Sequence, residues 1–212
     1  MTYQELFDEI KLLSKRGDID DKITAAIRTV TLRAHRLDTF SRDMVEVQLS
    51  FGGATAYTIV DVNVLQWLPR YRAVRYMRYW EPSTGYLGKM LTAIDPRDVL
   101  DDYNWEKHDR YYLAGDVLKL RFEFPSYGVQ IGYYCDPILT PTSQYNSWIA
   151  DKLPDLIIQG ALAQVFNWTG KQEEARVINA MVGFETNPGN NKNKGPTLVE
   201  QLRQYALEDV AR

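Results

Sequence analysis

The stretch LKLRFEFPSYGVQIGYYC, residues 118–135, decides the fold class of this chain. Apolar residues alternate with charged ones up to a Pro-Ser-Tyr-Gly turn at 125–128, and they alternate again from Val129 to Cys135. A period of two places alternate side chains on opposite faces of a strand. The pattern therefore predicts an antiparallel hairpin with one buried side, in which Cys135 is a buried, unreactive thiol.

The region before this stretch also has strand character. Alternation at 45–49, apolar residues at 57–62 and a long β-rich run at 70–80 predict three more strands, with Gly52 and Gly53 in a turn between the first two. Asp95 and Pro96 have the order of an N-cap and a first helical residue, which predicts a short helix over 99–103.

Helical patterns precede these strands. Thr2 and Glu5 have capping-box spacing before a helix that we expect to end at Gly17. A second helix is predicted from Asp20 or Asp21. The apolar positions expected to face the core are Leu6, Phe7, Ile10 and Leu13 in the first helix, and Ile23, Ala26, Ile27, Val30, Ala34 and Leu37 in the second.

Helical patterns also follow the strands. Pro154 opens a helix whose apolar stripe extends to Trp168, Gly170 ends that helix, and 171–181 forms a neighbour packed against it. Residues 183–196 are rich in glycine, asparagine, lysine and proline, which predicts a flexible linker. A second capping box, Thr197 and Glu200, opens a final helix with Leu198, Leu202, Tyr205 and Val210 on one stripe. The order of elements predicts an α+β fold, a helical bundle built from both chain ends with an inserted antiparallel β region.

Composition excludes several classes of protein. The 212 residues carry a formal net charge of −3, which disfavours a generally basic nucleic-acid binder. One cysteine and two histidines are too few for a disulfide framework or a convincing metal site. The N-terminal residues lack a signal-peptide pattern, and no apolar run is long enough to span a membrane. We expect a soluble chain that folds in a reducing cytosol.

Catalytic signatures are missing from the sequence. It contains no phosphate-binding glycine loop, dinucleotide fingerprint or nucleophile elbow. A Ser/His/Asp triad stays open, because its members need not be close in the chain. His35 and His108 are interpreted as solvated surface residues, and Asp98, Asp101 and Asp102 as the solvated face of the short helix rather than a glycosidase pair. We predict no catalytic, cofactor-binding or metal-binding residues, and no enzyme activity.

Aromatic residues are frequent, with 14 Tyr, 7 Phe and 5 Trp. Such residues favour protein interfaces, and a carbohydrate-binding surface would show the same excess. The basic and aromatic run at 70–80 is interpreted as an exposed strand face or subunit interface, with nucleic-acid contact as the alternative. The interface candidates in this run are Arg72, Arg75, Tyr76, Arg78 and Trp80.

Three segments in the second half resemble a known family. They are YLAGDVLKL at 112–120, VQIGYY at 129–134 and LPDLIIQGAL at 153–162, and the likeness continues through Val165-Phe166 and TGKQEEA at 169–175. Together they are similar to the head-to-tail adaptor, or tail tubular, proteins of short-tailed bacteriophages. The segment 183–196 departs from this resemblance.

The resemblance implies a structural virion protein, located in the tail or neck and assembled in the bacterial host cytoplasm. Such adaptors form a ring, usually of twelve copies, below the portal protein. The ring extends the DNA channel, lets DNA pass without sequence specificity, and is a platform for nozzle and tail proteins. No membrane partner is implied. Because these adaptors commonly grip the portal with their C-terminal region, Leu198, Leu202 and Tyr205 are predicted to dock on it.

We therefore predict an adaptor domain over 1–182, comprising helices at 3–37, a mainly β region at 42–136 and helices at 145–182. The flexible linker at 183–196 and a C-terminal helix at 197–212 follow it. The alternatives are another tail structural protein, such as a tail terminator or tube component, and a carbohydrate-binding module. Helical segments at both ends disfavour the carbohydrate-binding alternative, since such modules are mostly β.

Overall fold

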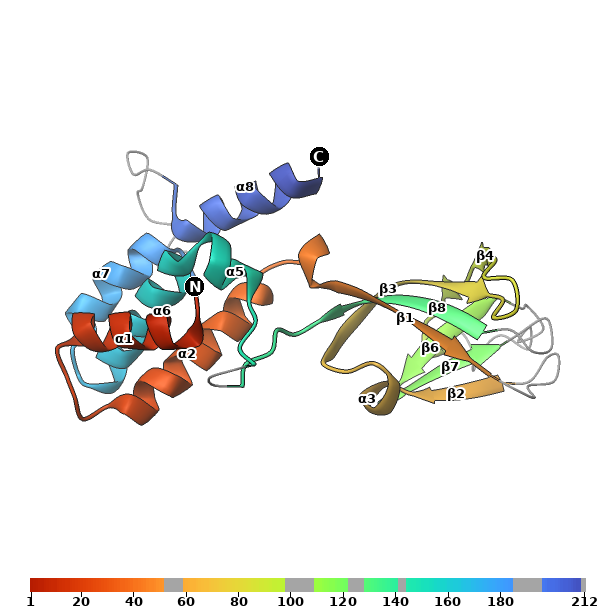
Figure 1. Ribbon diagram of the computed structural model, residues 1–212, viewed down its shortest axis with the longest axis horizontal. Coiled ribbons are helices and arrows are strands. Elements are labelled where there is room, and N and C mark those ends of the chain that lie inside the picture. Colours follow the sequence, from red (N-terminus) through yellow and green to blue (C-terminus); the bar gives the residue numbers. More distant parts are fainter. Residues whose placement is uncertain (52–58, 98–108, 122–127, 141–143, 185–195, 211–212) are drawn as a thin grey trace. The chain divides into compact units, whose positions relative to one another are not determined.

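The computed structural model describes the whole chain except residues 52–58, 98–108, 122–127, 141–143, 185–195 and 211–212. The chain divides into two compact units, Met1–Asp43 with Asp136–Arg212, and Met44–Cys135. The first unit is helical and the second is built of strands (Figure 1). The predicted α+β fold, with a bundle made from both chain ends and an inserted β region, is therefore confirmed. The grouping of 1–182 as one domain stays a prediction.

Helix α6 is the centre of the helical unit (Figure 1). It packs against each of the unit's other α-helices, and most of its residues are buried. A Cβ atom at Gly160 would lie 2.7 Å from Val30 Cγ1, so glycine permits the close approach of α2 to α6. The elements of this unit are α1 (Tyr3–Ser14), α2 (Asp20–His35), the 3₁₀ helix η1 (Ser41–Asp43), α5 (Trp148–Lys152), α6 (Pro154–Trp168), α7 (Gln172–Val182) and α8 (Leu198–Val210).

Local sequence signals place the ends of the first two helices. The predicted capping box is present at α1, where the Glu5 amide donates to Thr2 Oγ1 and the Thr2 amide donates to Glu5 Oε2. The predicted stop at Gly17 is wrong. The chain leaves the helix at Lys15, which has a φ of 53° and donates its amide to the Leu12 carbonyl. Helix α2 begins at Asp20 as predicted, and its apolar stripe from Ile23 to Ala34 is buried.

The corner between α6 and α7 also follows the prediction. Gly170 has a φ of 82°, a conformation that side chains disfavour, and the two helices pack as neighbours. Trp168 was expected on the buried stripe, and this is wrong because the stripe ends at Val165, one turn before the end of the helix.

Two sheets face each other in the β unit (Figure 1). Among the described residues, sheet A has the strand order β1-β8-β3-β4 and sheet B the order β2-β7-β6-β5. All pairs are antiparallel except β5 with β6. The elements are β1 (Met44–Ser50), β2 (Ile59–Asn63), α3 (Val64–Trp67), β3 (Tyr71–Trp80), β4 (Leu87–Met90), β5 (Thr92–Ala93), β6 (Arg110–Ala114), β7 (Val117–Arg121) and β8 (Gly128–Cys135).

The predicted hairpin at 118–135 is wrong. Strand β7 pairs with β2 and β6 in sheet B, whereas β8 pairs with β1 and β3 in sheet A. The alternation correctly marks the inward side chains: Leu118 and Leu120 from one sheet meet Val129 and Ile131 from the other in a common core. All residues of β8 are buried, including Cys135 as predicted. Both faces of this strand are therefore covered, whereas the prediction was one buried side.

Other predictions for the β unit are mixed. Strands β2 and β3 match the predicted segments, and in β1 Leu49 and Val47 face the core while Val45 is exposed. Asp95 accepts a hydrogen bond from the Arg97 amide at 2.8 Å, and Pro96 and Arg97 are helical. The predicted helix over 99–103 lies outside the described residues, as do Asp98, His108, Phe122, Phe124 and most of the linker at 183–196. Asp101 and Asp102 lie within that helix and are also outside the described residues.

Gly170 and Gly17 differ in backbone conformation, so alanine substitutions at the two positions form a matched test of stability. Gly170→Ala should lower the free energy of unfolding by about 1–2 kcal/mol, because alanine is strained at positive φ. Gly17→Ala, at an open position without positive φ, should leave it within about 0.5 kcal/mol of the native value. Urea denaturation of both variants checks this. Equal losses at the two positions would contradict the assigned helix ends.

Candidate functional site

Three of the predicted interface residues share one surface of the β unit. Tyr76, Arg78 and Trp80 lie on the side of β3 opposite Met77 and Tyr79, which are buried in the sandwich core. Arg78 pairs with Met90 and Trp80 with Leu87 in register, so these β4 side chains are on the same surface. We define the outer face of sheet A by Glu46, Gln48, Tyr76, Arg78, Trp80, Leu87, Met90 and Gln130.

Two glycines of β8 make room for the aromatic rings of this face. A Cβ atom at Gly132 would lie 2.3 Å from Tyr76 Cε1, and one at Gly128 would lie 2.7 Å from Trp80 Cε3. Both distances are shorter than real contacts, so only glycine allows the two rings to cover the β8 backbone. The rings of Tyr76 and Trp80 are thus held in place by the central strand.

A polar network connects three strands across the same face. Gln130, only 6% exposed, donates through Nε2 to Glu46 Oε2 at 3.0 Å and to the Tyr76 hydroxyl at 3.4 Å. Its Oε1 accepts a hydrogen bond from Gln48 Nε2 at 3.1 Å, and the Tyr76 hydroxyl donates to Glu46 Oε1. Burial and the hydrogen bond to Glu46 raise the pKa of Tyr76 above its ordinary value. The phenol therefore stays protonated and acts as a donor at neutral pH.

Arg78 lies directly opposite Gln130 in the register of β3 and β8. The side-chain groups of Gln130 are already used by Glu46, Gln48 and Tyr76. The Nε atom of Arg78 is buried, and it has no hydrogen-bond acceptor in the part of the chain that the structure describes. A buried donor without an acceptor costs about 1–3 kcal/mol, and more when the group is charged.

The structure separates Arg72 and Arg75 from the other interface candidates. The register moves from the pair Tyr71 and Cys135 to the pair Ala73 and Tyr134, so Arg72 is an extra residue in a bulge. Arg75 is the extra residue of a second irregularity, before Tyr76 pairs with Gly132. Their role in a subunit interface stays a prediction, because neither continues the alternating face of Tyr76, Arg78 and Trp80.

The predicted docking residues on α8 have different environments. Leu202 is fully buried in the helical core and Leu198 packs against it, together with Val199, which the predicted stripe did not include. Tyr205 is 49% exposed. The predicted capping box is present, with the Glu200 amide bound to Thr197 Oγ1 at 3.3 Å and the Thr197 amide bound to Glu200 Oε2 at 2.7 Å. The docking role of this helix stays a prediction.

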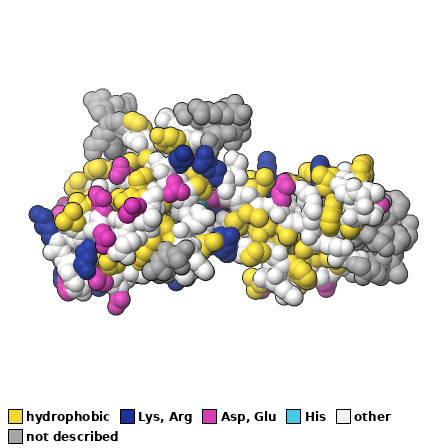
Figure 2. Space-filling view, in the orientation of Figure 1, with side chains coloured by type: hydrophobic (Ala, Val, Ile, Leu, Met, Phe, Trp, Pro, Cys, Tyr) yellow, Lys and Arg dark blue, Asp and Glu magenta, His cyan; other side chains and the backbone are white. Residues whose placement is uncertain are grey.

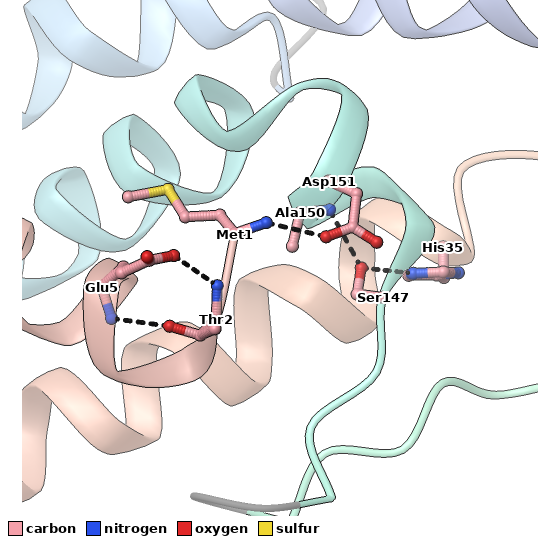
Figure 3. A network of polar contacts seen from close by, with 7 residues as sticks. All are labelled: Met1, Thr2, Glu5, His35, Ser147, Ala150 and Asp151. Carbon is pink, nitrogen blue, oxygen red and sulfur yellow. Dashed lines mark hydrogen bonds and ion pairs between the residues drawn. The ribbon is translucent and has the colours of Figure 1, made fainter.

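A buried Asp-His-Ser cluster lies in the helical unit. His35 is 1% exposed, so its interpretation as a solvated residue is wrong. Its Nδ1 lies 2.8 Å from Asp43 Oδ1, and its Nε2 lies 2.9 Å from Ser147 Oγ (Figure 3 shows the Ser147 side). The sequence signal that could have revealed this is helical phase, because His35 follows the buried Ile27 and Thr31 at intervals of four.

The surroundings of this cluster indicate a structural role. Ser147 Oγ also accepts the Ala150 amide at 3.2 Å and so caps α5 (Figure 3). Asp43 Oδ1 also accepts the indole N–H of Trp148 at 2.7 Å. Ser147 is itself buried, so a substrate has no access to its hydroxyl in this structure.

A cavity of about 470 Å³ is also present in the helical unit, beside α1 and α2. Its lining includes Tyr3 and Tyr145, whose hydroxyls are already hydrogen-bonded to Thr24 and Thr31. Burial raises the pKa of Tyr145 to about 12. Because these polar groups are paired within the chain, the cavity does not indicate a particular ligand.

Neither the distribution of surface charge nor the placement of metal-ligand residues indicates another site in the described part of the chain. On the face shown in Figure 2, acidic and basic side chains are interspersed over the helical unit. Across the described ranges, no cluster of three or more His, Cys, Asp or Glu residues is arranged to hold a metal ion. Within the same residues, no helix combines the length and apolar character needed to cross a membrane.

Comparison with protein families identifies the chain at family level. Residues 1–186 match the family model of the SU10 adaptor protein, which is most of the chain. The chain belongs to the SU10 adaptor family. The search of curated proteins found no match to the chain. The resemblance to phage head-to-tail adaptors is thereby confirmed, and membership of this family makes the chain a structural protein and virion component of a bacteriophage.

The extent of the match differs from the extent of the resemblance. The family match includes α1 and α2 as well as the β unit, α6 and α7, whereas the resemblance rested on segments from 112 onward. The match ends at residue 186, before α8 begins at Leu198. The helix predicted to dock on the portal is therefore outside the matched part of the SU10 adaptor.

Asp43→Ala should destabilise the chain by about 2–4 kcal/mol, because the buried His35 Nδ1 and the partly buried Trp148 Nε1 both lose their hydrogen bond to the Asp43 carboxylate. Asp18→Ala removes a carboxylate from an exposed pair with Arg16 and should change stability by less than about 0.5 kcal/mol. Chemical denaturation followed by tryptophan fluorescence compares the two. A loss below 1 kcal/mol for Asp43→Ala would show that the cluster does not support the fold.

Proposed function

We propose that this SU10 adaptor forms a ring of about twelve copies under the portal of the phage head, as the family resemblance implies. The ring extends the DNA channel and is a platform for the nozzle and tail proteins. The observation that supports this proposal most is the outer face of sheet A. It presents aromatic, apolar and arginine side chains on a surface that none of the described segments covers.

The chemistry of this face suits a contact between proteins. Tyr, Trp and Arg are the residue types that contribute most to binding at interfaces, and Tyr76, Arg78 and Trp80 are here side by side. Leu87 and Met90 extend the face with exposed apolar surface. The formal net charge of −3 fits a channel wall that lets DNA pass without sequence-specific contacts.

The portal contact is assigned to α8. Leu198 and Leu202 hold this helix on the bundle, while Tyr205 and the neighbouring Leu207 are exposed. The helix follows a long polar segment, whose length adds little entropic cost to a change of position. We infer that Tyr205 makes the first contact with the portal. We also infer that the chain has no catalytic role, since its Asp-His-Ser cluster is buried and serves as a cap.

The first test is assembly on the portal of the same phage. The isolated chain should sediment as a monomer or weak oligomer at micromolar concentration, because no described contact requires a partner for folding. With portal rings added, electron microscopy should show a second ring of adaptor below the portal. A stable dodecamer of the isolated chain would contradict the portal-dependent assembly, and the absence of any adaptor–portal complex would contradict the proposed function.

The second test removes α8. A chain ending at Gly195 should remain folded, since α1, α2, α6 and α7 keep most of the helical core, but it should lose portal binding. Circular dichroism monitors the fold, and co-sedimentation with portal rings measures binding. Tyr205→Ala keeps the helix and should weaken portal binding without changing stability. If the truncated chain is folded and still binds portal, the docking role of α8 is wrong.

A further inference from the structure

We propose that the outer face of sheet A binds α7 of a second copy, with Glu173 and Glu174 of that helix directed at Arg78. This inference rests on the proposed ring and names the surfaces that join neighbouring copies. Both surfaces belong to one chain, and each is without a partner in the described structure.

Arg78 defines the chemistry required of the occupant. It is flanked along β3 by Tyr76 and Trp80, whose rings are held against Gly132 and Gly128. The acceptor groups nearest in the sheet are engaged in the network of Gln130, Glu46 and Gln48. The positive charge of the partly exposed Arg78 therefore favours a partner that supplies a carboxylate, while Trp80, Leu87 and Met90 favour apolar side chains beside it.

Helix α7 presents this combination on its exposed side. Val177 is 63% exposed and Met181 is 55% exposed, and the two are one helical turn apart. Glu173 and Glu174, in the first turn of α7, lie on the same side, opposite the buried Ala175 and Val182. Exposed apolar side chains that recur at helical spacing are typical of a helix that packs against a partner.

The two surfaces are complementary and different from each other. The carboxylates of α7 match the positive charge of Arg78, and Val177 and Met181 match the apolar part of the outer face. A contact between two different surfaces of identical copies is heterologous, and repeated heterologous contacts produce a ring when the rotation closes. A copy therefore uses its outer face toward one neighbour and its α7 toward the other.

DNA is the other class of partner that an arginine could bind, and the face does not favour it. Glu46, whose carboxylate is hydrogen-bonded to Gln130 and Tyr76, places a negative charge on the same face, and the exposed side chains of Leu87 and Met90 add apolar surface. A duplex backbone requires several cations, whereas Arg78 is the one cation among the residues that define this face.

Charge reversal tests the contact directly. Arg78→Glu and the double variant Glu173→Lys/Glu174→Lys should each reduce the adaptor bound per portal ring by about tenfold or more, as expected for reversal at a charged contact. An equimolar mixture of the two variants should restore assembly. In an alternating ring every outer face then meets an α7 of opposite charge, whereas a ring of either variant alone brings like charges together.

The control is Lys22→Glu, which makes the same charge change at an exposed position of α2, and it should assemble like the native chain. If the native chain itself fails to assemble on the portal, the proposed function fails. If the native ring forms and Arg78→Glu leaves it unchanged, or if the mixture does not restore assembly, the pairing of these surfaces is wrong. Loss of duplex DNA binding by Arg78→Glu with intact assembly would assign the face to DNA and also overturn the pairing.

A crosslinking experiment covers the case in which charge reversal unfolds the protein. Leu87→Cys on β4 and Met181→Cys on α7 are both at exposed positions, and the native Cys135 is buried. On the portal, a short bis-maleimide should link the doubly substituted chain into a ladder of oligomers. Each single variant should give no ladder. A ladder that is absent from the assembled double variant would overturn the proposal.

Discussion

The buried pair of His35 and Asp43 is the interaction on which the organisation of the chain depends. The helical unit is made of two segments separated by the whole β unit, so the chain must leave it after Asp43 and re-enter it at Asp136. His35, at the end of α2, connects Asp43 on the outgoing segment with Ser147 on the returning one. Arg36, the next residue, binds the Asp136 carboxylate through Nε and Nη2. Both connections are thus tied to the end of one helix, and this allows a β unit to be inserted without opening the bundle.

Strand β8 has the corresponding role in the β unit. It is paired on both sides, so its inward side chains form the core and its outward positions are also covered. Glycine at two of these outward positions gives space to the rings of Tyr76 and Trp80. Gln130, which lies between the two glycines, is hydrogen-bonded to side chains of both neighbouring strands. The network pairs its own members, and the buried Nε of Arg78 has no hydrogen-bond acceptor among the described residues. A surface whose side chains are already fixed in this way loses little conformational entropy when it binds a partner.

Helix α8 is attached to the helical bundle by few buried side chains. Its own core is small, formed mainly by Leu202 and Val199, and its first residue is preceded by Thr197, which occupies the space beside Gly183 at the end of α7. The family match ends at residue 186, before this helix begins. A helix held by few buried side chains can be released at lower cost than one in the centre of the core.

Much of the architecture was determined by the sequence itself. Capping boxes, the α2 stripe, the Pro154 start, the Gly170 corner and the segments of β2 and β3 were predicted, because each depends on residues close together in the chain. Tyr76, Arg78 and Trp80 were predicted as interface residues together with Arg72 and Arg75, from the basic and aromatic composition of the run at 70–80. Tertiary structure decided the rest: β7 and β8 belong to different sheets, Arg72 and Arg75 are in bulges, His35 is buried, and Gln130, Glu46, Leu87 and Met90 complete the outer face. The physical reason is that alternation specifies which side of a strand is buried, whereas backbone hydrogen bonds carry no residue identity and leave the choice of neighbouring strand to the packing of the whole core.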